Sequence, residues 1–168
     1  VVINPEEMWG RVKQNHKAEM TVEELVAMER EELLRIFSDP ETPLDPIPGI
    51  TELINSIRSD SIRTAVASSS PRIMIDLILN RADLFSSFTE IVSGEEVENG
   101  KPDPAIFVLA ANLLGIETKW CTVIEDSPHG VAAAKAAGMK CVGFLNPNSG
   151  GQDLSDADLL VSSFSQEN

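Results

Sequence analysis

The sequence predicts an α/β fold in which helices cover both faces of a parallel sheet. From about residue 50 onward, short continuous apolar segments alternate with stretches of helical periodicity. Continuous apolar segments are typical of strands buried on both faces, and their alternation with helices indicates parallel strands. The chain has 168 residues, of which 42% are hydrophobic, enough for one compact core with a small appendage.

The first part of the chain is expected to be helical. Pro5, preceded by Asn4 and followed by two glutamates, is typical of a helix start, and the pattern predicts a helix over residues 5–17. Thr21 and Glu24 have the spacing of a capping box, which predicts a second helix that runs to about residue 37.

A proline-rich linker separates this helical part from the rest. Residues 39–49 contain four prolines, each of which removes a backbone donor and favours extended geometry in the residue before it. We therefore expect two domains, over residues 1–43 and 44–168. Because the sequence opens with Val1 rather than Met, it is expected to be a piece of something longer.

In the second part of the chain, predicted helices alternate with predicted strands. The expected helices cover residues 50–58, 71–80, 104–114 and 129–137, and the expected strands cover residues 62–67, 89–92, 121–124 and 140–144. In the third helix, the predicted buried stripe consists of Ile106, Leu109, Ala110, Leu113 and Leu114. Gly115 is expected to end that helix.

Composition excludes several classes of function. The net charge of −14, without a basic cluster and with 5% aromatic residues, argues against nucleic acid as a partner. No apolar run approaches the ~20 residues of a membrane span, and no signal segment opens the chain. The two cysteines, Cys121 and Cys141, are expected to be buried free thiols. We therefore expect a soluble, cytoplasmic protein that has no membrane partner.

Polar residues follow the predicted strands, where parallel sheets bind ligands. Ser68, Ser69 and Ser70 follow one strand, Lys101 lies in the loop after the next, and Glu125 and Asp126 follow a third. Consecutive residues of a strand point to opposite faces, so the two carboxylates can share a ligand only where the strand turns.

Each of these residues has a functional and a structural interpretation. Glu125 and Asp126 suit Mg²⁺, which takes one or two carboxylates, but Asp126 could instead cap the following helix. Ser68 could bind an anion before a helix start, or the serines could simply form a turn in which Ser70 is the N-cap. Lys101 could hold a transferring phosphoryl group, or it could be solvated.

The combination of these motifs resembles one enzyme family. The segments AVASSS, GKPDPAIF and VIEDSPHGVAAAKAAGM, in this order, resemble the haloacid dehalogenase (HAD) superfamily and its beta-phosphoglucomutase-like phosphatases and mutases. The resemblance covers about residues 46–165. It implies a Rossmann-like core in which Ser68 and Ser69 bind phosphate, Lys101 holds phosphate and nucleophile, and Glu125 and Asp126 bind Mg²⁺. Residues 1–43 would be part of a helical cap.

The family nucleophile lies in a D-x-D motif that ends the first strand. The D-x-D of this sequence, Asp156 to Asp158, comes late and follows no apolar strand, so we reject it as the nucleophile. The resemblance places the missing strand between the strands that carry the serine and the acidic pair, which implies a gap at the centre of the sheet. A preceding segment or a neighbouring copy is expected to complete it.

We therefore expect a Mg²⁺-dependent phosphatase that hydrolyses a small phosphorylated metabolite through an aspartyl-phosphate. The alternatives are a beta-phosphoglucomutase-type sugar phosphomutase and a catalytically inactive binding module with the same fold. A nucleotide-binding α/β protein is disfavoured because neither G-x-G-x-x-G nor a P-loop pattern follows any predicted strand.

Overall fold

A computed structural model describes residues 5–16 and 19–165 of the chain. The chain divides into two compact units, Val1–Leu44 and Asp45–Asn168. Each unit is described here by itself. Within the described residues, no helix has the length and apolar character needed to cross a membrane.

The first unit contains two helices that pack against each other. Helix α1 spans Pro5–His16 and helix α2 spans Val22–Ser38. Thr21 and Glu24 form the predicted capping box at the start of α2, with the side chain of each accepting a hydrogen bond from the backbone of the other. A hydrogen bond of 2.7 Å from Trp9 Nε1 to Glu29 Oε2 links the two helices.

The second unit contains the elements that position the site. Its helices are α3 (Ile50–Ser59), α4 (Arg72–Arg81), α5 (Ala105–Leu114) and α6 (Pro128–Ala136). Its strands are β1 (Ala65–Ser68), β2 (Glu90–Ser93), β3 (Thr122–Glu125), β4 (Lys140–Phe144) and β5 (Leu159–Val161). Three short 3₁₀ helices complete it: η1 (Phe85–Ser87), η2 (Gly94–Glu96) and η3 (Thr118–Trp120).

The predicted helices and strands are present, most of them with bounds shifted by no more than one residue, and two differences are larger. Strand β1 begins at Ala65 rather than at residue 62, because the chain turns at Ser61, whose φ is 59°, and Ile62 is exposed. Strand β5 was not predicted, since three residues carry too little periodicity to be distinguished from a loop.

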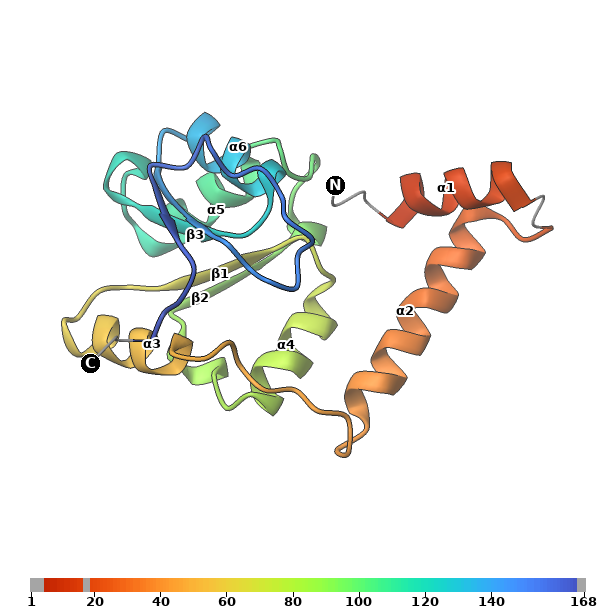
Figure 1. Cartoon of the computed structure of the whole chain (residues 1–168), viewed down its shortest axis with the longest axis horizontal. Coiled ribbons are helices and arrows are strands. Elements are labelled where there is room, and N and C mark those ends of the chain that lie inside the picture. Colours follow the sequence, from red (N-terminus) through yellow and green to blue (C-terminus); the bar gives the residue numbers. More distant parts are fainter. Residues whose placement is uncertain (1–4, 17–18, 166–168) are drawn as a thin grey trace. The chain divides into compact units, whose positions relative to one another are not determined.

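All strand pairings are parallel, which confirms the predicted α/β class. Strands β1 and β2 form one sheet, and β3, β4 and β5 form a second sheet in that order. Figure 1 shows α5 and α6 on one side of the strands and α3 and α4 on the other. Strands β1 and β3 are each hydrogen-bonded to one neighbour within the described residues, so each has an edge without a strand partner.

The core lies between the strands and helices α5 and α6. Ala133 and Ala134 are fully buried, since their small side chains let α6 approach β4 closely. The stripe predicted for α5 is partly wrong: Leu113 is 48% exposed, whereas Phe107 and Ala111 are buried. The helix is buried over a wider face than the stripe implies, because it contacts both β1 and β2.

Both cysteines are free thiols, but only one is fully buried. Cys141 on β4 has no exposed surface, and burial raises the pKa of its thiol to about 11. Cys121 is partly exposed, so the expectation of two buried thiols is wrong for it; burial still raises the pKa of its thiol.

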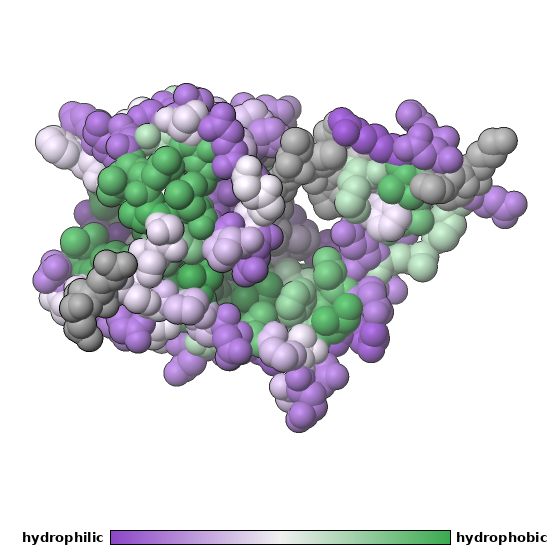
Figure 2. Space-filling model, in the orientation of Figure 1, coloured by the Kyte–Doolittle hydropathy of each residue, from purple (hydrophilic) through white to green (hydrophobic). Residues whose placement is uncertain are grey.

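Several apolar side chains of the three-stranded sheet are exposed to solvent. They are Ile124 on β3, Leu145 after β4, and Leu159 and Leu160 on β5. Figure 2 shows apolar surface on the second unit, over the strands drawn in blue in Figure 1. Ile124 and Leu159 both align with Val142 in the register, so they lie on one face of the sheet, which has no complete covering layer within the described residues; Leu160 points to the opposite face.

Candidate active site

The side chain of Lys101 links the carboxyl ends of β1 and β3. Its Nζ donates a hydrogen bond of 3.1 Å to the carbonyl oxygen of Ala67 on β1, and it donates to Glu125 Oε1 at the end of β3. The same ammonium group lies 4.7 Å from the centre of the Phe107 ring on α5. Lys101 therefore joins two separate sheets at the edge where parallel sheets bind ligands.

The Lys101–Glu125 ion pair is largely removed from water. The side chains are 12% and 10% exposed, so Lys101 is not a solvated loop lysine. Withdrawing two charges from water is costly and is offset only when they meet in good geometry with further hydrogen bonds. The structure provides both, because each partner makes additional hydrogen bonds.

The start of α6 holds the second oxygen of Glu125. Glu125 Oε2 accepts hydrogen bonds from the Ser127 backbone amide at 3.3 Å and from Ser127 Oγ at 3.0 Å. Ser127 Oγ also accepts from the Gly130 amide at 3.0 Å and so caps α6. The alternative in which Asp126 caps this helix is therefore wrong.

Gly130 makes room for the Glu125 carboxylate. A Cβ atom at this position would lie 2.0 Å from Glu125 Cδ, far inside van der Waals contact. A larger residue here would require the Glu125 carboxylate to move; the glycine matters for this close approach and not for its backbone, since it lies within the helix.

Asp126 lies in the bend between β3 and α6 and is held by the loop that follows β4. Asp126 Oδ2 accepts hydrogen bonds from Asn146 Nδ2 at 2.8 Å and from Ser149 Oγ at 2.9 Å. Within the described residues, Asp126 Oδ1 has no hydrogen-bond partner. The two neighbouring carboxylates are therefore held by different partners, Glu125 by a cation and Asp126 by neutral donors.

This pair of carboxylates suits Mg²⁺. A Mg²⁺ ion bound here would take most of its remaining oxygen ligands from water and from the substrate. Mg²⁺ takes oxygen ligands and is usually bound through one or two carboxylates plus water and phosphate oxygens. The described residues contain no group of three or more acidic, histidine or cysteine side chains that could hold a metal by themselves. Asp126, with one carboxylate oxygen not engaged by a described residue, would be the first ligand, and Glu125 would supply an oxygen beside it.

Ser68 and Ser69 occupy the turn between β1 and α4. Ser68 ends β1, and its Oγ accepts a hydrogen bond of 3.2 Å from the Ser70 amide, while Ser69 is exposed. Ser70 is not the N-cap of α4, because Pro71 occupies that position without a side-chain cap. Instead, the first amide of the helix, that of Arg72, donates to Glu95 Oε2 at 2.9 Å.

The D-x-D segment lies at the other end of the second sheet. Asp158 accepts hydrogen bonds from Lys135 Nζ at 2.7 Å, Lys140 Nζ at 3.2 Å and the Cys141 amide at 2.8 Å. Lys140 and Cys141 begin β4, whereas the candidate site lies where the strands end. The position of Asp158 is therefore consistent with its rejection as a nucleophile.

The structure thus brings Lys101 and Glu125 into contact, with Asp126 adjacent. Ser68 and Ser69 lie at the end of β1, one and two residues after the Ala67 carbonyl that Lys101 contacts. Sequence reasoning assigned no role to the residues that hold these groups, which are Ser127, Gly130, Asn146 and Ser149. Only Ser127 had a local signal, a serine directly before a proline at a helix start.

The fold and the site define a Rossmann-like α/β protein with a cationic and acidic cluster at the carboxyl ends of its parallel strands. The sequence profile of the family described as "Haloacid dehalogenase-like hydrolase" matches residues 4–144. The chain belongs to this family.

Two relatives illustrate its range. Beta-phosphoglucomutase of Bacillus subtilis is 38% identical over 120 residues, which cover 71% of this chain and 50% of the relative. The phosphorylated carbohydrates phosphatase of Thermotoga maritima is 36% identical over 132 residues, which cover 78% of this chain and 60% of the relative. The chain therefore spans about half the length of these relatives.

A solved structure shows the same fold. CbbY from Rhodobacter sphaeroides in complex with phosphate superimposes with a TM-score of 0.85 at 25% identity, covering 95% of this chain and 73% of that one. A mutant of the same protein in complex with xylulose 1,5-bisphosphate has a TM-score of 0.83, at the same identity and with coverages of 96% and 73%.

Proposed function

We propose that this chain is part of a Mg²⁺-dependent phosphatase that hydrolyses a small phosphorylated metabolite, such as a sugar phosphate, through an aspartyl-phosphate. The observation that carries the proposal is the largely buried Lys101–Glu125 ion pair next to Asp126, at the edge of the sheet where β1 ends in Ser68. Relatives named for their action on phosphorylated carbohydrates support the class of substrate.

Each residue has a role that follows from its position. Ser68 Oγ and the exposed Ser69 would donate hydrogen bonds to phosphate oxygens, and the Lys101 ammonium would hold the phosphoryl group by its charge. Glu125 and Asp126 would bind Mg²⁺, which neutralises charge on the phosphoryl oxygens. Phosphoryl transfer depends mainly on positioning and charge stabilisation, and this set of groups supplies both.

The nucleophile is proposed to be an aspartate outside the residues that build this site. Its strand would lie between β1 and β3, whose facing ends Lys101 already links. The two helices of the Val1–Leu44 unit would be part of a cap that closes over the substrate.

Phosphate release from a panel of phosphorylated sugars, measured for the full-length protein with Mg²⁺ and with EDTA, tests the proposal. We expect Mg²⁺-dependent release that is lost in the Glu125→Ala, Asp126→Ala double variant, together with Mg²⁺ binding measured by calorimetry. Unchanged Mg²⁺ affinity in the double variant would contradict the assigned metal site.

A phosphomutase is the second candidate, because the relative that is 38% identical is named beta-phosphoglucomutase. The two functions differ in the fate of the phosphate. ³¹P NMR of a reaction with β-glucose 1-phosphate would show glucose 6-phosphate for a mutase and inorganic phosphate for a phosphatase. An inactive binding module would bind phosphate but would form neither glucose 6-phosphate nor inorganic phosphate from β-glucose 1-phosphate.

A further inference from the structure

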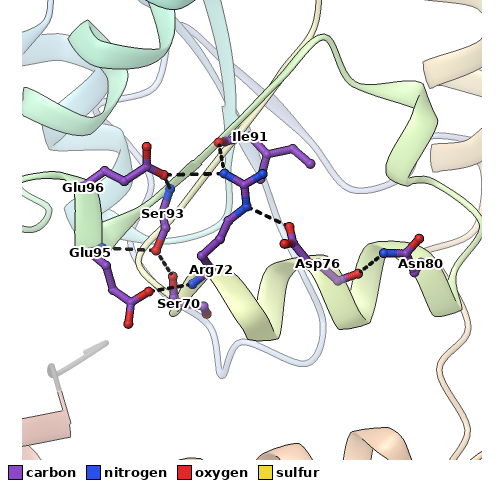
Figure 3. A network of polar contacts seen from close by, with 8 residues as sticks. All are labelled: Ser70, Arg72, Asp76, Asn80, Ile91, Ser93, Glu95 and Glu96. Atoms are coloured by element: carbon purple, nitrogen blue, oxygen red, sulfur yellow. Dashed lines mark hydrogen bonds and ion pairs between the residues drawn. The ribbon is translucent and has the colours of Figure 1, made fainter.

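The turn that follows β1 is held in place by the residue that ends β2. Ser93 pairs with Ser68 in the parallel register, and its side chain has no exposed surface. Its Oγ donates a hydrogen bond of 2.8 Å to the carbonyl oxygen of Ser70 (Figure 3). This bond spans 23 residues of sequence and connects the ends of the two strands directly.

The orientation of the Ser93 hydroxyl is itself determined by η2. Ser93 Oγ accepts a hydrogen bond of 3.1 Å from the Glu95 amide, and the Ser93 amide donates to Glu96 Oε1 at 2.8 Å. These two bonds form a capping box on a single turn of 3₁₀ helix. The Glu95 amide occupies one acceptor direction of the hydroxyl oxygen, and the hydroxyl hydrogen is donated to the Ser70 carbonyl oxygen.

Further contacts connect the Ser68–Ser70 turn and the start of α4 with the segment around Ser93. A Cβ atom at Gly94 would lie 2.8 Å from the carbonyl oxygen of Ser69, so the two backbones touch at this point. The Arg72 amide donates to Glu95 Oε2, and Arg72 Nη1 donates to the Ile91 carbonyl oxygen at 3.2 Å (Figure 3). The first residue of α4 is thus tied to both ends of the segment around Ser93.

We propose that Ser93 is a positioning residue for phosphate binding, which it serves by holding the Ser68–Ser70 turn. The proposal rests on the proposed function, because it assumes that this turn receives the phosphate. Ser93 itself would not contact the phosphate, because its hydroxyl donates to the Ser70 carbonyl oxygen and accepts from the Glu95 amide. Without it, the Ser70 carbonyl oxygen loses its donor, and the turn loses one of the contacts that hold its hydroxyl and amides in one orientation.

The test compares Ser93→Ala with Ser87→Ala in the full-length protein. Ser87 is also buried, at 7% exposure, but it lies on η1 and not in the turn. Its hydroxyl accepts a long hydrogen bond from Arg58. With p-nitrophenyl phosphate as substrate and inorganic phosphate as inhibitor, we expect Ser93→Ala to raise KM and Ki together by about tenfold, the effect of one lost hydrogen bond. Ser87→Ala should change both by less than twofold, and kcat should change less than KM in either variant.

Hydrogen exchange of the backbone amides of Ser69, Ser70 and Arg72 provides a second measurement that does not depend on activity. Faster exchange in Ser93→Ala alone, with the rise in Ki, supports the proposal. Equal effects of both variants, or unchanged exchange and Ki in Ser93→Ala, would overturn it. If the wild-type protein neither binds phosphate nor cleaves the ester, the proposed function fails, and the role of Ser93 in phosphate binding fails with it. The exchange data then show separately whether Ser93 holds the turn.

Discussion

At the scale of single residues, one buried ion pair combines a role in the fold with a proposed role in chemistry. Lys101 and Glu125 lie 24 residues apart and meet between two sheets. A loop lysine between a strand and a helix is expected to add little to a core, yet this one is 12% exposed. Removing it leaves Glu125 buried with its neutral partner Ser127 but without a cation.

Lys101→Ala should therefore abolish most activity and also lower the free energy of unfolding, by about 3 kcal/mol in the presence of EDTA. Phosphate release and urea unfolding followed by circular dichroism measure the two effects. Lys119→Ala is the matched control, because the Lys119–Glu117 pair is exposed and should contribute less than about 1 kcal/mol. Similar losses of stability in both variants would show that the buried Lys101–Glu125 pair contributes no more to the free energy of unfolding than an exposed pair does.

Asp158 makes part of the stability depend on pH. The ammonium of Lys135, and then the amide of Cys141, hold the pKa of Asp158 well below its ordinary value of 3.8. A carboxyl group whose pKa is depressed by folding stabilises the protein above its unfolded-state pKa and loses this contribution as pH falls below it.

We expect Asp158→Asn to be less stable than the wild type at pH 7, and the difference to shrink below about pH 4. Thermal unfolding from pH 7 to pH 3 measures it. Asp156→Asn, two residues earlier and exposed, is the control and should follow the wild type throughout. A difference that persists unchanged at pH 3 would contradict the electrostatic explanation.

At the scale of elements, the first turn of α6 shapes the acidic end of β3. Ser127 caps the helix and holds Glu125, and Gly130 leaves the space that the carboxylate fills. A glycine inside a helix ordinarily costs about 1 kcal/mol relative to alanine. Its presence here indicates that access for the carboxylate outweighs helix propensity.

Gly130→Ala should accordingly destabilise the protein and weaken Mg²⁺ binding by about tenfold or more, since Glu125 must move away from its present position. Calorimetry with Mg²⁺ and thermal unfolding provide the measurements. Gly10→Ala in α1 is a matched helical control, because nothing lies within 4 Å of its Cβ position, and it should raise stability. Increased stability and unchanged Mg²⁺ affinity in Gly130→Ala would show that the close contact can relax without consequence.

At the scale of the whole second unit, the parallel strands form two sheets rather than one. Strands β1 and β3 each have an edge without a strand partner within the described residues. Such an edge presents unpaired N–H and C=O groups that pair readily with a strand of another segment or of a second copy. We infer that a further strand pairs with these edges in the working protein.

The 168-residue chain expressed alone should therefore self-associate or fold poorly, and it should not hydrolyse phosphate esters. Light scattering after gel filtration, urea unfolding and a phosphate-release assay test this. Co-expression with a segment that supplies the further strand should restore a monomeric, cooperative and active protein. A monomeric chain that unfolds cooperatively and releases phosphate by itself would show that its nucleophile lies within these residues.

Local signals in the sequence determined most of the elements of this protein. The capping box of Thr21 and Glu24 begins α2, and Gly115, with a φ of 66°, ends α5, because both signals act within one turn of helix. Apolar strands that alternate with helices also predicted the α/β class, and their carboxyl ends predicted the positions of Ser68, Lys101, Glu125 and Asp126.

Tertiary structure decided which of these residues meet and what holds them. The bond from Ser93 to Ser70 spans 23 residues, and the bond from Asn146 to Asp126 spans 20. Neither pair has a local pattern, since each depends on how strands lie beside one another and on which loops follow them. The three residues of β5 are recognisable as a strand only through pairing with β4, because so short a segment has no periodicity of its own.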